Sequence, residues 1–80
     1  MPVWKVRGNS RFYRQFDMLE NKATKIKLHR LMNEVINTKI PEKLSFVHPT
    51  DERNVFVIIS GSHAITFHKG RVWLKFRALV

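Results

Sequence analysis

The sequence has no cysteine and few acidic residues, and these shortages exclude several classes of protein. Without cysteine, the chain can form neither a disulfide scaffold nor a zinc or iron–sulfur site with thiolate ligands. Its longest unbroken apolar run, residues 55–59, is far shorter than the ~20 residues that a helix needs to span a bilayer. The first eight residues contain no apolar stretch of signal-peptide length. We therefore expect a cytoplasmic (intracellular) protein with no membrane segment.

The acidic residues are also unevenly distributed along the chain. Lys and Arg number 15 against six Asp and Glu, which gives a net charge of +9. All six acids lie between Asp17 and Glu52, so the charged side chains of residues 1–16 and 53–80 are all basic. Such a field favours a polyanionic partner, and nucleic acid is the first candidate. It does not distinguish DNA from RNA or single from double strands.

Length and motif content limit the function further. Eighty residues suffice for one domain, residues 1–80, and leave it a thin margin of stability. The sequence contains no glycine-rich nucleotide loop, no paired-carboxylate metal motif, no HExxH and no GxSxG. We therefore expect neither a cofactor nor a metal site, and no serine-nucleophile chemistry.

Helical periodicity is confined to about residues 10–37. Apolar residues from Phe12 to Ile26 recur at alternating steps of four and three, and a second apolar stripe runs from Leu28 to Ile36. At 100° per residue, the centres of the two stripes lie about 160° apart. A break near residues 21–24 would explain this, with helices at about 10–20 and 22–37 and Ser10 as the first N-cap. A single helix whose ends contact different partners is the alternative.

The rest of the chain has the patterns of strands. Residues 3–7 and 44–47 predict two short strands, with a turn at 48–51, and longer strands follow at 55–59, 63–68 and 71–77. Gly61-Ser62 is a two-residue hairpin signal. The predicted fold is α+β: a small, mainly antiparallel sheet of four or five strands, with one or two helices (about residues 10–37) packed on one face.

The last strand alternates strictly between apolar and polar residues. If Lys69-Gly70 is a two-residue turn, Phe67 pairs with Val72 and Ile65 with Leu74, so both pairs are apolar. Val72, Leu74 and Phe76 then face the helices. His63 falls on that same side, opposite Phe76, where a structural histidine is expected.

The other side of this hairpin carries the candidate binding residues. Cations every second residue along a strand are about 6.6–7 Å apart, close to the spacing of successive phosphates. A tryptophan among them offers a stacking surface for an unpaired base. The helix macrodipole disfavours arginines near a helix N-terminus, and a bound phosphate would offset this unfavourable interaction. The predicted nucleic-acid-binding residues are Arg71, Trp73, Lys75, Arg77, His68, Arg11 and Arg14.

Three functions are compatible with these patterns. We favour non-catalytic binding of nucleic acid, largely through phosphate contacts. The alternative is a small regulator or inhibitor of a larger nucleic-acid enzyme, which binds a protein partner or forms a homodimer through Val55, Val57 and Ile59. The third is an RNA-cleaving toxin, in which His68 would act with Arg71 or Lys75 in acid–base catalysis.

A short segment bears on the third function. Gly61-Ser62-His63, followed by Phe67, resembles the Gly-Ser-His segment of small interferase toxins with a double-stranded-RNA-binding-like fold. The resemblance covers fewer than ten residues, and the aromatic residue is displaced by one position. It implies a catalytic role for His63.

Overall fold

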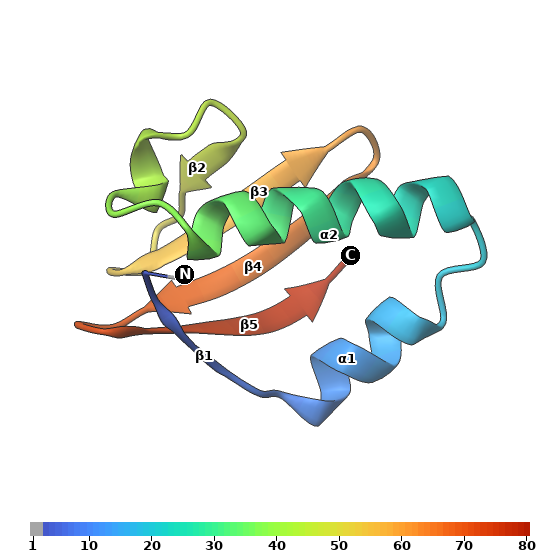
Figure 1. Ribbon diagram of the computed structural model, residues 1–80, viewed down its shortest axis with the longest axis horizontal. Helices are drawn as coiled ribbons and strands as arrows, with labels where there is room; N and C mark the ends of the chain where they lie inside the picture. Colours follow the sequence, from blue (N-terminus) through green and yellow to red (C-terminus); the bar gives the residue numbers. More distant parts are fainter. Residues whose placement is uncertain (1–2) are drawn as a thin grey trace.

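Two helices, each with an asparagine as its N-cap, lie on one face of a five-stranded sheet in the computed structural model, which describes residues 3–80 (Figure 1). Helix α1 spans Ser10–Asp17 and α2 spans Lys22–Ile36. The predicted division into two helices is confirmed, but α1 ends at Asp17 and not near residue 20, so the break lies at residues 18–21. Ser10 is not the N-cap, because the Asn9 side chain accepts hydrogen bonds from the backbone N–H groups of Arg11 and Phe12.

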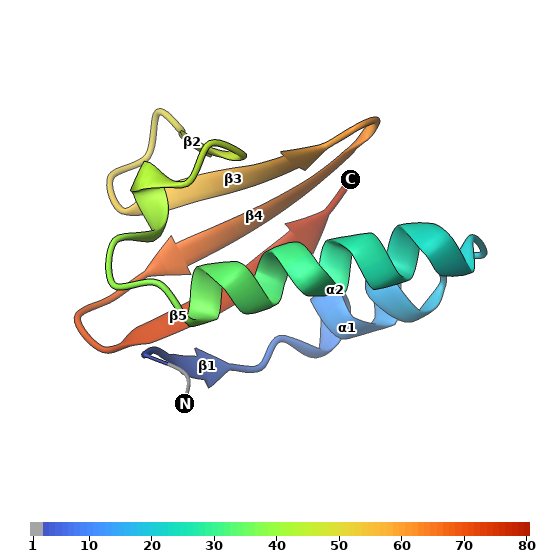
Figure 2. The ribbon, with the colours of Figure 1, turned by 45° about the horizontal axis from the view of Figure 1, so that its top comes forward.

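The sheet is mixed, with its first strand at one edge. Its strands are β1 (Lys5–Arg7), β2 (Val47–Pro49), β3 (Val55–Ser60), β4 (His63–Lys69) and β5 (Trp73–Leu79). They lie in the order β1-β5-β4-β3-β2, and β1 runs parallel to β5 whereas the other pairs are antiparallel. Figure 2 shows β1 beside β5 and α2 passing over the sheet. The predicted α+β class is confirmed, with five strands.

The segment between α2 and β3 differs from the prediction. A short 3-10 helix, η1 (Pro41–Lys43), comes first, and the strand expected at 44–47 is instead Val47–Pro49. The backbone N–H of Val47 donates to the carbonyl of Leu44, so the chain turns at residues 44–46, and the first bond to β3 is from the N–H of Ile59 to the carbonyl of Phe46. The turn that follows lies at residues 50–54 and includes Asn54, whose φ is 62°.

The structure confirms the turn predicted for the first hairpin and contradicts the turn predicted for the second. Ser60 pairs with His63 across Gly61-Ser62, as predicted, and Gly61 has a φ of 58° that suits glycine. In the second hairpin, however, Lys69 pairs with Leu74, and three residues, 70–72, connect the strands. Phe67 therefore pairs with Phe76, four positions beyond the predicted partner.

A shift of four residues moves the pairs but not the faces, because side chains alternate with a period of two. Ile65, Phe67, Leu74 and Phe76 are all buried, as expected. Val72 is not, since the longer turn includes it and leaves its side chain 59% exposed. His63 lies opposite Ser60 and not Phe76. A bulge follows, because Phe67 pairs with Phe76 and Thr66 with Ala78, so that Arg77 is the extra residue.

The core fills the space between the helices and one face of the sheet. The ring of Phe76 stacks on Phe12 of α1 at 5.6 Å between centroids and contacts Phe67 at 6.0 Å. Apolar residues of α2 complete it: Leu28, Met32 and Val35. We call the face of the sheet that packs against the helices the covered face. No helix within residues 3–80 is both long and apolar enough to cross a membrane.

One end of the core is closed by polar contacts. Lys69 extends from the covered face to Glu42, with 2.6 Å between Nζ and Oε2, and lies near the rings of Trp4 and Phe56. The indole N–H of Trp4 donates to the carbonyl of Thr38. Burial raises the pKa of the Glu42 carboxyl, but the hydrogen bond and the charge of Lys69 outweigh it. The net pKa lies below its ordinary value.

Candidate nucleic-acid interface

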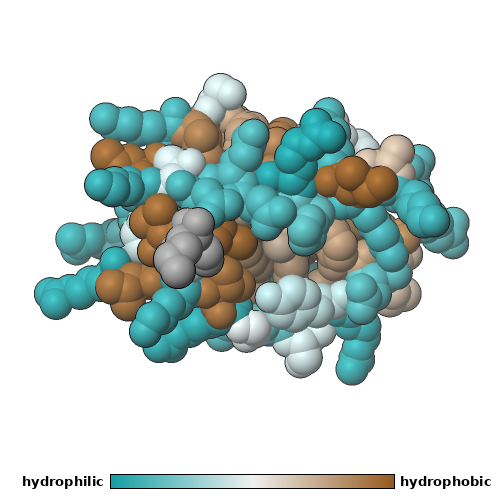
Figure 3. Space-filling view, viewed as in Figure 1, coloured by the Kyte–Doolittle hydropathy of each residue, from teal (hydrophilic) through white to brown (hydrophobic). Residues whose placement is uncertain are grey.

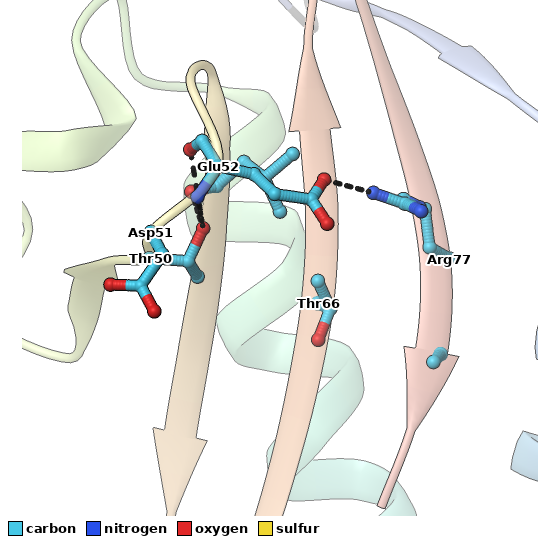
Figure 4. A pocket seen from close by; sticks show the side chains of 7 residues that line it. Thr50, Asp51, Glu52, Thr66 and Arg77 are labelled. Carbon is cyan, nitrogen blue, oxygen red and sulfur yellow. Dashed lines mark hydrogen bonds and ion pairs between the residues drawn. The ribbon is translucent and has the colours of Figure 1, made fainter.

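Both helices pack on the covered face, so the opposite face of the sheet has no helical cover from residues 3–80, and we call it the open face. The strand pairings place Trp73, Lys75 and His68 on it, together with Lys5 and Arg7 of β1. Figure 4 views part of this face, with α2 behind the strands. The open face therefore collects basic side chains from the two ends of the chain.

Trp73 is the centre of a cluster built from three strands. The guanidinium carbon of Arg7 lies 4.8 Å from the centroid of the Trp73 ring. The His68 ring meets the indole edge-on, with centroids 5.0 Å apart and planes 85° apart. Lys75 is the pairing partner of both Arg7 and His68. Two groups able to bind phosphate thus contact one aromatic ring, and a third, Lys75, is the strand partner of both.

Arg7 was not among the predicted binding residues. It enters the cluster because β1 pairs in parallel with β5. In this pairing Lys5 lies beside Trp73, 68 residues later in the sequence. The alternation Trp4-Lys5-Val6-Arg7 does put Lys5 and Arg7 on a common face. No local signal indicates which strand they lie beside.

The other predicted residues are divided among three places. Arg77 is at the bulge, where its Nη1 is 3.2 Å from Oε2 of Glu52, so an acid does partly offset the charge of this strand. Arg71 is exposed in the β4–β5 turn and is not on the strand. Arg11 and Arg14 are on α1, which packs on the covered face through Phe12, so they lie in the helical layer.

The turn before β3 and the bulge of β5 form a pocket of about 350 Å³ at the far end of the open face. Its lining residues are Thr50, Asp51, Glu52, Val55, Thr66, Arg77 and Ala78. In Figure 4 the side chains of Glu52 and Arg77 point toward one another across Thr66. The Thr50 hydroxyl fixes the turn, since it accepts from the Glu52 N–H and donates to the Val55 carbonyl.

The apolar residues of β3 are only partly available to a partner. Val55 is 5% exposed and so is covered by its own chain, contrary to its predicted place in an interface. Val57 is half-buried and Ile59 is 46% exposed, and both lie on the open face. A smaller apolar surface than expected therefore remains.

A second hollow lies on the other side of the molecule, between β1 and α2. It is lined by Val3, Trp4, Lys5, Val6, Asn33, Ile36 and Asn37. The space-filling view of the helical side shows apolar side chains gathered beside the N-terminal segment (Figure 3). No predicted binding residue lines this hollow.

The histidines do not form a metal site. Within residues 3–80, no three side chains of the types that bind metals are close enough to hold an ion. His63 and His68 are five residues apart on β4 and so face opposite sides of the sheet. His68 is on the open face with Lys75, whereas His63 is at the β3–β4 end of the covered face.

Comparison with known proteins supports the fold. No family model matches the chain. No curated protein matches it either. Among solved structures, a chain of the RelBE2 toxin–antitoxin complex from Mycobacterium tuberculosis superimposes with a TM-score of 0.74, over 100% of this chain and 92% of that one.

The two chains share a fold. Their sequences are 9% identical, so the RelBE2 match extends to the backbone arrangement and no further. The resemblance of Gly61-Ser62-His63 to interferase toxins finds no family model to support it.

Proposed function

We propose that the open face binds a strand of nucleic acid, with the Trp73 cluster at the centre of the interface. The observation that supports this most is the contact of Arg7 and His68 with the Trp73 ring, with Lys75 beside them. Its basic groups come from separate strands and converge on one aromatic side chain.

The chemistry divides between charge and stacking. Lys5, Arg7 and Lys75 contact phosphates and release counterions, which makes the affinity dependent on salt and largely independent of sequence. The exposed part of the indole stacks against an unpaired base. Arg7 already lies against the ring, so a base stacks beside or over its planar guanidinium, which is itself a stacking surface.

Two triple variants with equal loss of charge test the location. One replaces Arg7, Lys75 and Arg77 with Ala on the open face, and the control replaces Lys22, Lys27 and Arg30 with Ala on the exposed side of α2. We expect the first to weaken binding of single-stranded RNA and DNA strongly and to reduce the salt slope by about one per lost phosphate contact. Equal effects of the two variants would mean that net charge alone attracts the ligand.

A second candidate function is binding of a protein partner. Two observations favour it: Ile59 and Val57 leave apolar surface on the open face, and RelBE2 is a complex of a toxin with an antitoxin. On this hypothesis the chain is a small regulator or a toxin with a protein inhibitor. Sedimentation velocity of the wild type and of Ile59→Lys tests the homodimer form. A concentration-dependent dimer that the substitution abolishes would support it.

RNA cleavage is tested with the same oligonucleotides. Loss of full-length RNA in the binding reaction, abolished by His68→Ala, would replace the binding hypothesis with that of a toxin. His68 and Lys75 are paired across β4 and β5, which places an imidazole beside an ammonium group.

A further inference from the structure

The pocket between Glu52 and Arg77 contains an acid on a face that otherwise favours phosphate. A carboxylate repels the phosphate backbone of a nucleic acid. Because Glu52 lies beside β5, the ligand group that it contacts is expected to be something other than a phosphate. The Thr50 hydroxyl holds the turn through hydrogen bonds to Glu52 and Val55, and the Asn54 carbonyl accepts from the N–H of Lys69. The turn that carries Glu52 is therefore anchored to the sheet.

The pocket has the size and floor of a site for a single base. Its volume of about 350 Å³ lies at the small end of the range for ligand sites, roughly 300–1,000 Å³. The bottom of the pocket is lined by Ala78, Thr66 and the small exposed part of Val55, and the charged groups stand at the rim. A flat aromatic ring with polar edges fits such a floor, whereas a phosphate does not.

The ion pair at the rim is weak enough for a ligand to replace. Arg77 and Glu52 have side chains that are 43% and 68% exposed, and pairs of this kind contribute little to stability. A bound nucleotide can satisfy each partner separately, with Arg77 on a phosphate and Glu52 on the base.

We propose that this pocket, with Glu52 as the reading residue, gives the open face a preference for guanine. The Watson–Crick edge of guanine presents two adjacent donors, N1–H and the N2 amino group, which match the two oxygens of one carboxylate. Adenine and cytosine present an acceptor beside their amino group, and uracil presents one donor between two acceptors. The inference rests on the proposed function and adds a base preference to it.

The position on β5 sets where the guanine lies in the ligand. Trp73, Lys75 and Arg77 follow one another along the strand at about 6.6–7 Å per two residues, somewhat less across the bulge. A strand of nucleic acid that stacks one base on Trp73 and places phosphates along Lys75 brings a base about two nucleotides away to the pocket. A single guanine in a uridine oligomer is therefore sufficient for recognition.

Fluorescence anisotropy with labelled RNA heptamers tests the inference. The oligomers are all-uridine, or uridine with one central guanosine, inosine or adenosine. We expect the guanosine oligomer to bind about five- to twenty-fold more tightly than the uridine and adenosine oligomers. Inosine, which lacks the N2 amino group, should fall between them.

Glu52→Gln is the decisive variant, and Glu20→Gln is the control that removes the same charge from the exposed connection between the helices. Glu52→Gln should bring the guanosine and uridine oligomers within about twofold of each other without weakening the uridine oligomer. Glu20→Gln should leave the preference unchanged. A preference that survives Glu52→Gln, or wild-type binding of all oligomers alike, overturns the guanine site and leaves the proposed function intact. Binding of no oligomer at low salt overturns both.

Discussion

The indole of Trp73 lies over the backbone of Gly70, in the space that a side chain at residue 70 would occupy. A Cβ at Gly70 would overlap Cε2, Nε1 and Cζ2 of the ring. The two residues are also joined by a hydrogen bond of 2.8 Å from the Gly70 N–H to the Trp73 carbonyl. Gly70 therefore fixes the position of the aromatic ring around which the basic cluster forms.

Gly70→Ala should displace the Trp73 ring and weaken binding without unfolding the protein. The φ of Gly70 is outside the left-handed region, so the backbone accepts alanine and the effect is steric. In a Trp4→Phe background Trp73 is the only tryptophan, and its emission should shift. Gly8→Ala is the control, because a Cβ there meets its nearest atom, in Tyr13, at an ordinary 3.6 Å. An unchanged emission spectrum and affinity would show that the ring has room to move.

Trp73→Ala and Lys75→Ala should weaken binding in different ways. Loss of the indole should cost single-stranded ligands ~1–3 kcal/mol with nearly the same salt slope, because stacking releases no counterions. Loss of Lys75 should weaken binding to all sequences alike and lower the slope by about one. Titrations at several salt concentrations separate the two. Equal slopes in both variants would remove Lys75 from the phosphate contacts.

Phe76→Ala should destabilise the fold by ~3–5 kcal/mol, since the ring is 1% exposed and packs against Phe12 and Phe67. Val72→Ala, four residues earlier on the same chain, should change the free energy of unfolding by less than about 0.5 kcal/mol because Val72 is exposed. Urea melts of both variants give the comparison. Similar midpoints for the two would be incompatible with the register of β5.

The contact of Glu42 with Lys69 should contribute to acid sensitivity. The folded pKa of Glu42 lies below its unfolded value, so the contribution is fully present above the unfolded pKa, about 4.3, and is lost as the pH falls through the folded pKa. Glu42→Gln should therefore be less stable than the wild type at neutral pH, and the difference should shrink below about pH 4.3. Urea melts from pH 7 to pH 3 measure it. A difference that is constant with pH would assign the effect to packing.

Patterns within short segments predicted most of the fold. The division into two helices, the Gly61-Ser62 turn and the faces of β5 all depend on local periodicity, and the structure has them, although the break between the helices lies at residues 18–21 and not at 21–24. The β4–β5 register could not be predicted in this way, because a slip of four residues leaves every side chain on the same face. What distinguishes the two registers is the pairing of Phe67 with Phe76 and the packing of Trp73 on Gly70, both tertiary contacts.

Local patterns predicted only part of the candidate site. Trp73, Lys75 and His68 share the open face because alternation along two adjacent strands places them there. Arg7 and Glu52 join the site through contacts with distant segments, β1 with β5 and the 50–54 turn with the bulge. Their roles depend on strand order and on one extra residue in β5, neither of which leaves a pattern in nearby sequence.

The position of β5 has a consequence for synthesis of the chain. The strand lies between β1 and β4, yet it follows every other element of the sheet in the sequence. Until residues 73–79 have left the ribosome, β1 has no neighbour and one edge of β4 is open to pairing with other chains. Folding therefore awaits one late strand, and during that delay electrostatic repulsion between highly cationic nascent chains protects them from aggregation.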